Sequence, residues 1–373
     1  MVDAVELTKQ LVRMNTVNPP GDEEACARVI GKLLSDSGFD VSYYPLGDRR
    51  ASLVARIGGS RSKKPMCLTG HIDTVPLGAA PWTKDPFAGE TDSGSLYGRG
   101  TSDMKSGVAA MVAAAISFGD KLQTSPGLEL VITAGEEVGC DGAFDLVRQQ
   151  GALGRAGAVL VGEPSSNIPY IGHKGAFWLY AKTKGVTAHG SMPELGDNAI
   201  YKMAKAITAL EHFKFSTPPH PLMGQATLNV GMVNGGLNIN SVPDEAKITI
   251  DIRSVPTSGH DSIRNDLHKC LGPEVELETF IDLESVYSEP EDPWIQRVLD
   301  LTAPYLGARP EPKIGTYFTD AAALTPAYGS PPTLILGPGE LHMAHKTDEY
   351  CVIERVEAAV ALYKDIIKDW CEV

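Results

Sequence analysis

The sequence predicts an α/β protein in which a mixed, mostly parallel sheet is flanked by helices. Short apolar runs alternate with longer segments of helical apolar spacing, and this alternation is typical of sheets built from strand–helix–strand units. A small-residue segment, GVAAMVAAA, also predicts a helix that can pack closely against a sheet. The expected elements of this part are helices at 3–15, 21–37 and 104–117 and strands at 41–44, 53–57, 65–68 and 128–132.

A different pattern begins after Gly175. Its expected order is strand, helix, two strands, helix and strand, which is the order of a split βαβ sandwich. Helices at 293–306 and 354–370 then return to the first pattern. We therefore expect a discontinuous first domain, residues 1–174 and 290–373, and an inserted α+β ferredoxin-like domain, residues 175–289.

Composition narrows the class of protein. The 373 residues carry a formal net charge of −14, which argues against nucleic acid or an anionic membrane surface as the main partner. No apolar run approaches the roughly 18 residues of a membrane span, and the acidic, amphipathic N-terminus does not resemble a signal peptide. The cysteines form no CxxC pair, and Cys67 and Cys351 lie in apolar surroundings. We expect buried free thiols and a cytoplasmic protein.

The stretch LTGHIDTVP holds the first candidate site residues, His71 and Asp73. Side chains at positions i and i+2 of an extended segment point to the same side. Both would therefore project from the carboxyl end of a buried strand, where open α/β sheets bind their ligands. Asp73 could fix the tautomer of His71 or bind a metal itself. A plain structural hydrogen bond between the two is an equal alternative.

Four further segments place a carboxylate or a histidine after an apolar run or before a helix. They carry Asp103, the pair Glu136 and Glu137, Glu163, and His345. Each alone has an ordinary explanation: a helix N-cap, a solvated loop, a turn and a surface histidine. Together with His71, they make a set of metal ligands at the loop ends of one domain.

The chemistry of this set suits two divalent cations. Imidazole and carboxylate favour zinc, cobalt or manganese, and the scattered cysteines offer no structural zinc site. In a two-metal site ~3.5–4 Å wide, one carboxylate must bridge the ions. Of the adjacent acids Glu136 and Glu137, one can bind metal while the other accepts a proton from the attacking water. The residues therefore predict metal-assisted hydrolysis.

Seven motifs follow one another along the chain: GHIDTVP, GRGTSDMKSG, TAGEEVG, GEP, GVTAHGSMP, NSVPDEAKITIDIR and AHKTDEY. With them the chain resembles the co-catalytic zinc hydrolase family of acetylornithine deacetylase, succinyl-diaminopimelate desuccinylase, aminoacylase and the glutamate carboxypeptidases. The resemblance covers most of the chain. It implies that the first domain is catalytic and that the insert is a lid and dimerisation domain.

The resemblance also implies a role for each residue of the set. It implies one metal on His71, Asp103 and Glu163 and a second on Asp103, Glu137 and His345, with Asp103 bridging and followed by a cis peptide bond. Glu136 would be the general base and later the general acid, and Asp73 would orient His71. His342 is the rival of His345, and the HKTDE context favours His345.

In the insert, the resemblance implies substrate contacts. His189 would polarise the scissile carbonyl oxygen, in its own or a partner subunit's site. Asn240 and Arg253 would hold the carboxylate or amide of the substrate, and Lys174 would add positive charge. The alternatives are a salt bridge on the strand face for Arg253 and a turn for Asn240. The exposed strand and helix of the insert favour a homodimer.

The segment GTYFTDA departs from the GGTSDG pattern of desuccinylase-like sequences, because Phe318 replaces a small residue. Thr319, which we include among the substrate-binding residues, agrees better with the deacetylase-like pattern. We expect hydrolysis of an N-acyl amino acid with a free α-carboxylate. The alternative is a dipeptidase or a glutamate-type carboxypeptidase with the same site. A non-catalytic binding protein is disfavoured because the sequence retains every expected metal ligand and the expected general base.

Overall fold

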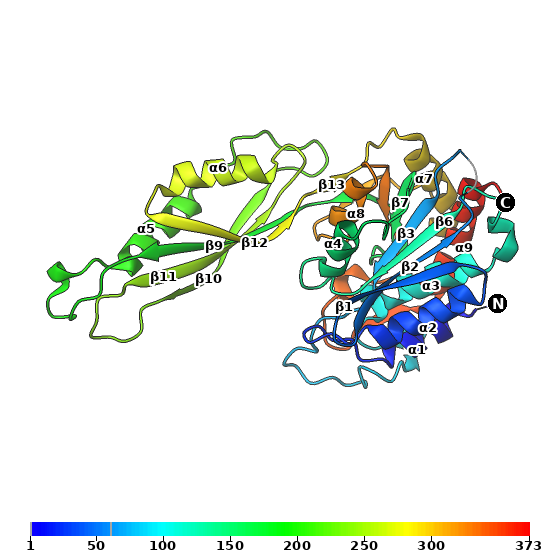
Figure 1. Ribbon diagram of the computed structural model, residues 1–373, viewed down its shortest axis with the longest axis horizontal. Helices are drawn as coiled ribbons and strands as arrows, with labels where there is room; N and C mark the ends of the chain where they lie inside the picture. Colours follow the sequence, from blue (N-terminus) through cyan, green and yellow to red (C-terminus); the bar gives the residue numbers. More distant parts are fainter. Residues whose placement is uncertain (1, 60–61) are drawn as a thin grey trace. The chain divides into compact units, whose positions relative to one another are not determined.

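The structure, a computed structural model, describes residues 2–59 and 62–373, which form two compact units. Figure 1 shows both, with labels on many of their helices and strands. The second unit comprises His173–Val286 together with Thr316–Phe318, and the first comprises the rest. Thr316–Phe318 was expected in the first domain. It groups with the second because the Phe318 ring packs edge-on against Trp178, with ring centroids 6.1 Å apart.

The first unit is built on a mixed sheet with the strand order β1-β2-β6-β3-β7-β15-β8-β13, and β14 pairs with β8. Strands β6, β3, β7 and β15 are parallel to one another, whereas β1, β2 and β8 pair antiparallel with their neighbours. This arrangement confirms the predicted mixed sheet with a parallel centre. The strands are β1 (Asp40–Gly47), β2 (Arg50–Ile57), β3 (Met66–His71), β6 (Leu128–Thr133), β7 (Ala158–Val161), β8 (Tyr170–His173), β13 (Val286–Tyr287), β14 (Lys313–Gly315) and β15 (Thr333–Ile335).

A small sheet with the order β16-β5-β4 also belongs to this unit. Its strands are β4 (Thr91–Asp92), β5 (Ser95–Tyr97) and β16 (Tyr350–Val352). This sheet was not expected from the sequence, because such short strands carry almost no periodic signal. It joins the segment before the GRGTSD loop to the segment after the AHKTDEY loop.

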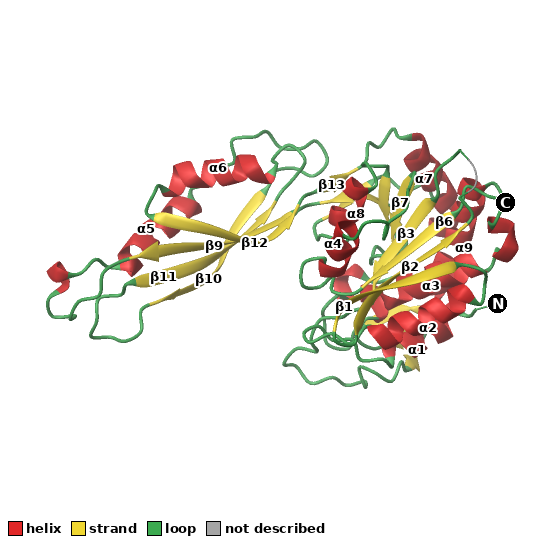
Figure 2. Ribbon diagram, viewed as in Figure 1, coloured by secondary structure: helices red, strands yellow, loops and turns green. Residues whose placement is uncertain are grey.

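Helices cover both faces of the large sheet, with α4 and α8 on one face and α1, α2, α3 and α9 on the other (Figure 2). Helix α3 is buried from Ser106 to Ala115, and its small side chains let it pack tightly against the sheet and α9. Helix α7 begins at Pro293 because Asp292 caps the next two amides. The helices are α1 (Ala4–Val12), α2 (Glu24–Ser35), α3 (Ser106–Ile116), α4 (Asp141–Arg148), α7 (Pro293–Leu306), α8 (Ala321–Ala327) and α9 (Ile353–Cys371).

The second unit has the predicted order of strand, helix, two strands, helix and strand. Its antiparallel sheet runs β10-β11-β9-β12. Along β11, Ile248, Ile250 and Ile252 are buried, whereas the residues between them are partly exposed. This alternation gives the sheet one face packed on its helices and one open face. The elements are β9 (Ala176–Lys184), α5 (Ala199–Glu211), β10 (Thr227–Gly235), β11 (Glu245–Arg253), α6 (His260–Leu271) and β12 (Val275–Leu283).

Two smaller features concern the cysteines and the apolar character of the helices. Cys67 and Cys351 are fully buried, and neither is in a disulfide. Among the helices of residues 2–59 and 62–373, none has both the length and the apolar character needed to cross a membrane.

Candidate metal centre

Three neighbouring parallel strands bring the first group of candidate residues to one edge of the sheet. His71 is the last residue of β3, which lies between β6 and β7. Glu136 and Glu137 follow β6, and Glu163 follows β7. Because the carboxyl ends of parallel strands share one edge, residues far apart in the sequence meet here.

The ligand atoms of five residues form two overlapping groups. In the first group, Nε2 of His71 lies 3.1 Å from Oδ1 of Asp103 and 3.5 Å from Oε1 of Glu163. In the second, Nε2 of His345 lies 3.3 Å from Oδ2 of Asp103 and 3.1 Å from Oε2 of Glu137. Within each group the ligand atoms lie within 4.8 Å of one another. Asp103 belongs to both groups and turns a different oxygen toward each.

Backbone features place Asp103 between the two groups. Gly100 adopts φ +85°, a left-handed conformation that favours glycine, and the peptide bond from Asp103 to Met104 is cis, as the resemblance implied. Gly107 lies so close to the end of β7 that a Cβ atom would stand 2.1 Å from the carbonyl oxygen of Gly162. Only glycine lets the start of α3 come this near to the loop that carries Glu163.

The electrostatics of the two groups fit divalent cations. Burial and the nearby Asp103 raise the pKa of Glu163 to about 8 and that of Glu137 to about 6. The hydrogen bonds that His345 donates to the carboxylates of Asp103 and Glu137 raise the pKa of its imidazole to about 10. Oε1 of Glu137 is buried and has no hydrogen-bond partner in the described chain. A cation in each group would neutralise this crowded negative charge and give the orphaned oxygen a partner.

Asp73 anchors the turn that carries both glutamates. Its carboxylate accepts hydrogen bonds from the amides of Glu136 (3.1 Å) and Glu137 (3.2 Å) and from Nδ2 of Asn18 (3.0 Å). Nδ1 of His71 lies 3.0 Å from the backbone oxygen of Asp73 and 3.4 Å from Oδ1. The main chain of Asp73 is therefore the nearer partner of His71. Asn18 was not predicted as a site residue, since its only signal was its place before two prolines.

Glu136 is buried beside the two groups but belongs to neither. Burial raises its pKa well above the ordinary value, the nearby His71 opposes this, and the carboxylates of Glu163, Glu137 and Asp320 add to it. The sequence pattern did not indicate Asp320 as a site residue either. It is buried and accepts a hydrogen bond from the hydroxyl of Thr133, the last residue of β6. Sγ of Cys140 lies 3.9 Å from Oε1 of Glu136, whose carboxyl group is in neither ligand group.

Two further residues considered in the sequence, His342 and Thr319, lie in the first unit. His342 lies outside both groups with 61% of its side chain exposed, so His345 and not His342 joins the second group. Thr319 is fully buried, and its hydroxyl accepts a hydrogen bond from the amide of Ala321 at the start of α8. This position gives Thr319 a structural role and no exposed atom for a substrate.

In the second unit, His189 and Asn240 lie side by side. Residue 189 pairs with Ser241 in an isolated bridge, and the amide of Gly190 donates to the backbone oxygen of Asn240 at 2.7 Å. Both side chains are exposed. Nδ1 of His189 lies 2.7 Å from the hydroxyl of Ser191.

Lys174 and Arg253 lie at the other end of the same sheet. Nζ of Lys174 donates to the backbone oxygen of Gln225 at 2.9 Å, and Arg253 pairs with Asp251 at 2.9 Å. Strand β11 starts just after the loop of Asn240 and ends at Arg253. Its eight residue steps of ~3.3 Å separate the two ends by about 26 Å. The structure does not bring these four candidate substrate residues together.

The fold and the two groups define the class: an α/β protein with a candidate dinuclear hydrolase centre. The chain belongs to peptidase family M20/M25/M40, whose profile matches residues 67–369. It is 32% identical to a probable succinyl-diaminopimelate desuccinylase of Staphylococcus epidermidis, over 99% of this chain and 98% of that protein. It is 29% identical to an acetylornithine deacetylase of Proteus mirabilis, over 98% and 96%.

A solved structure shares the fold over the whole length. It is an M20 family metallo-carboxypeptidase from Sulfolobus solfataricus, similar with a TM-score of 0.81 and 16% identity over 100% of both chains.

Proposed function

We propose that this protein hydrolyses the amide bond of an N-acyl amino acid that carries a free α-carboxylate, in the manner of a deacetylase or desuccinylase. The observation that carries the proposal is the pair of ligand groups sharing Asp103, with the unliganded Glu136 beside them. The curated relatives support it, because a desuccinylase and a deacetylase align with this chain over nearly its full length.

We propose two divalent cations, zinc first and cobalt or manganese as alternatives. His71, Asp103 and Glu163 would hold one, and Asp103, Glu137 and His345 the other. When bound, the two ions would polarise the amide carbonyl and lower the pKa of the attacking water. A backbone oxygen can only accept, so Nδ1 of His71 is the nitrogen that carries the proton. Its Nε2 lone pair is then directed toward the first group.

Glu136 transfers the proton in this proposal. Its carboxylate removes a proton from water, and the water oxygen forms a bond to the carbonyl carbon. Glu136 then gives the proton to the amide nitrogen as the C–N bond breaks, which yields a carboxylic acid and a free amine. The turn that holds Glu136 stays in place because Asp73 binds its amide.

We propose that the substrate contacts come from two subunits. An N-acyl amino acid has the length of about two residues, roughly 7 Å, which is far less than the length of β11. One substrate therefore does not reach both Arg253 and His189 of one sheet. We propose that Arg253 and Lys174 bind the α-carboxylate, while the partner subunit's His189 and Asn240 bind the carbonyl side.

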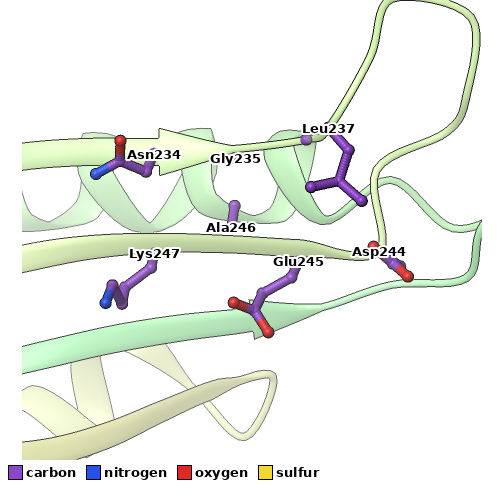
Figure 3. A pocket seen from close by; sticks show the side chains of 8 residues that line it. Asn234, Gly235, Leu237, Asp244, Glu245, Ala246 and Lys247 are labelled. Carbon is purple, nitrogen blue, oxygen red and sulfur yellow. The ribbon is translucent and has the colours of Figure 1, made fainter.

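The surface around β10 supports a homodimer through the second unit. β10 is an edge strand, and Met232 and Val233 are 59% and 64% exposed. The loop after it exposes Leu237 and Ile239 almost completely. A hollow of about 340 Å³ at the β10–β11 end is lined by Leu237 among others. Figure 3 shows the side chains that line it. An unpaired edge with exposed apolar side chains can pair with a second copy across a two-fold axis.

Co-expression of two inactive variants tests the exchange of His189 between subunits. Glu136→Ala and His189→Ala chains, each with its own tag, would form mixed dimers in which one site has both residues intact. If half the dimers are mixed, about a quarter of the wild-type activity should return. Activity no higher than that of the separate variants would show that His189 acts in its own chain. Each variant should keep its metals.

The substrate class is tested by amine release from a matched panel of N-acetyl, N-succinyl and N-formyl amino acids and dipeptides, with zinc-loaded protein. The proposal expects one acyl series to be preferred and a chelator to abolish the reaction. Cleavage of dipeptides alone would establish the alternative, a dipeptidase or carboxypeptidase.

A further inference from the structure

Arg99 and Glu349 form a buried ion pair that joins two loops of the candidate metal centre. Nη1 of Arg99 lies 2.6 Å from Oε2 of Glu349, and the two side chains are 1% and 0% exposed. Arg99 precedes the loop of Asp103, and Glu349 follows the loop of His345. Neither residue belongs to a ligand group, so their contact with the site is through other residues.

The carboxylate of Glu349 holds the backbone of the Asp103 loop. Oε2 accepts a hydrogen bond from the amide of Gly100 at 3.0 Å, and Oε1 accepts from the amides of Ser102 at 2.8 Å and Asp103 at 3.0 Å. With Arg99 included, one carboxylate satisfies donors from four residues. Because hydrogen bonds to a buried charge are strong, they fix the position of the shared ligand Asp103.

Arg99 contacts the backbone of two other site loops. Its Nη1 donates to the backbone oxygen of Lys346 at 3.2 Å, and its Nη2 donates to that of Pro76 at 3.1 Å. Pro76 lies in the loop that follows β3, and Lys346 is next to the ligand His345. One guanidinium therefore connects the loops that carry His71, Asp103 and His345.

The two ligand groups depend on this connection to different degrees. The side chain of His345 is 55% exposed, so packing does not hold it, and its φ of +64° is unusual for a residue other than glycine. His71 and Glu163, by contrast, are buried at the ends of strands. The position of His345 therefore relies on backbone contacts, of which the bond from Arg99 to Lys346 is one.

We infer that Arg99 and Glu349 are positioning residues that set the metal affinity of the second group, Asp103, Glu137 and His345. The inference rests on the proposed function, since it assumes that both groups bind metal. Losing the pair would loosen Asp103 and His345 together, whereas the first group keeps two buried ligands. Residues that orient metal ligands typically contribute 10–100-fold to affinity.

The test is calorimetric titration of metal-free protein with zinc, together with the visible absorption spectrum of the cobalt form. Glu349→Gln should weaken one of the two binding events by about 10–100-fold. It should weaken the other binding event less, since both groups share Asp103 but the first keeps two buried ligands, and it should alter mainly the absorption of the second cobalt equivalent. The matched control is Glu129→Gln. Glu129 is a buried carboxylate paired with Arg56 near the amino end of β6, away from the site. The Glu129→Gln protein should keep the wild-type zinc affinity of both sites.

If the Glu349→Gln protein does not fold, a second variant tests the same inference. Arg99→Lys retains the charge but cannot reach the backbone oxygens of both Pro76 and Lys346, so it should weaken the same binding event. Wild-type affinity at both sites in either folded variant would overturn the inference alone. A wild-type protein that binds no pair of metals would overturn the proposed function, and the inference with it.

Discussion

Replacing Glu136 by glutamine is expected to lower kcat by about 10²–10⁴-fold and to leave both metals bound. Glutamine has nearly the same shape but cannot accept the proton of the attacking water. Glu136 belongs to neither ligand group, and its turn is held by the carboxylate of Asp73 through backbone amides, which the substitution retains. Amine release and metal content, measured on the same preparation, check both parts of the prediction.

The neighbouring Glu137 provides the matched control. Glu137→Gln changes the next residue of the same turn in the same way, but Glu137 lies 3.1 Å from His345 in the second group. It should therefore lose metal as well as activity. A near-normal kcat in the Glu136→Gln protein would exclude Glu136 as the base. Loss of metal from that protein would show that Glu136 is a metal ligand.

Replacing Asp103 by asparagine is expected to reduce the binding of both metals and to bring activity down by about 10³-fold or more, since several kcal/mol of transition-state stabilisation depend on the ions. Asp103 is the one residue common to both groups. Asparagine keeps its size but removes the negative charge that faces both groups. Metal content per chain and amine release measure the effect.

His342→Ala is the comparison for this variant. His342 is in the same loop region as His345 but is exposed and lies outside both groups. It should keep its metals and its activity. An Asp103→Asn protein that retained two tightly bound metals would contradict the bridging role, and a His342→Ala protein that lost one would contradict the choice of His345.

Much of the site could be predicted because its residues follow strand ends. An apolar run ending in a turn with a carboxylate is visible in the sequence, and parallel strands then bring such turns together, as with His71, Glu137 and Glu163. The mixed sheet and the inserted unit follow from the same periodicity. The second unit was predicted in its order of elements because each of its strands and helices is long.

The rest depends on contacts that leave no local pattern. Glu349 lies in the AHKTDEY motif, but its partners are about 250 positions earlier in the chain. Asn18 reaches Asp73 across 55 positions, and its local sequence indicates only a turn. Asn240 and Arg253 share one motif, yet the extended strand between them carries them to opposite ends of a sheet. Burial of Thr319 likewise follows from its place beside α8, which the sequence pattern did not indicate.

We propose that two metals held by these groups support hydrolysis of an N-acyl amino acid. The most direct test is to titrate chelator-treated protein with zinc while measuring bound metal per chain and amine release from the preferred N-acyl substrate. We predict no measurable release without metal, two zinc ions bound per chain, and release that rises as they bind. Full release from the metal-free protein, or saturation at one ion per chain, would contradict the account.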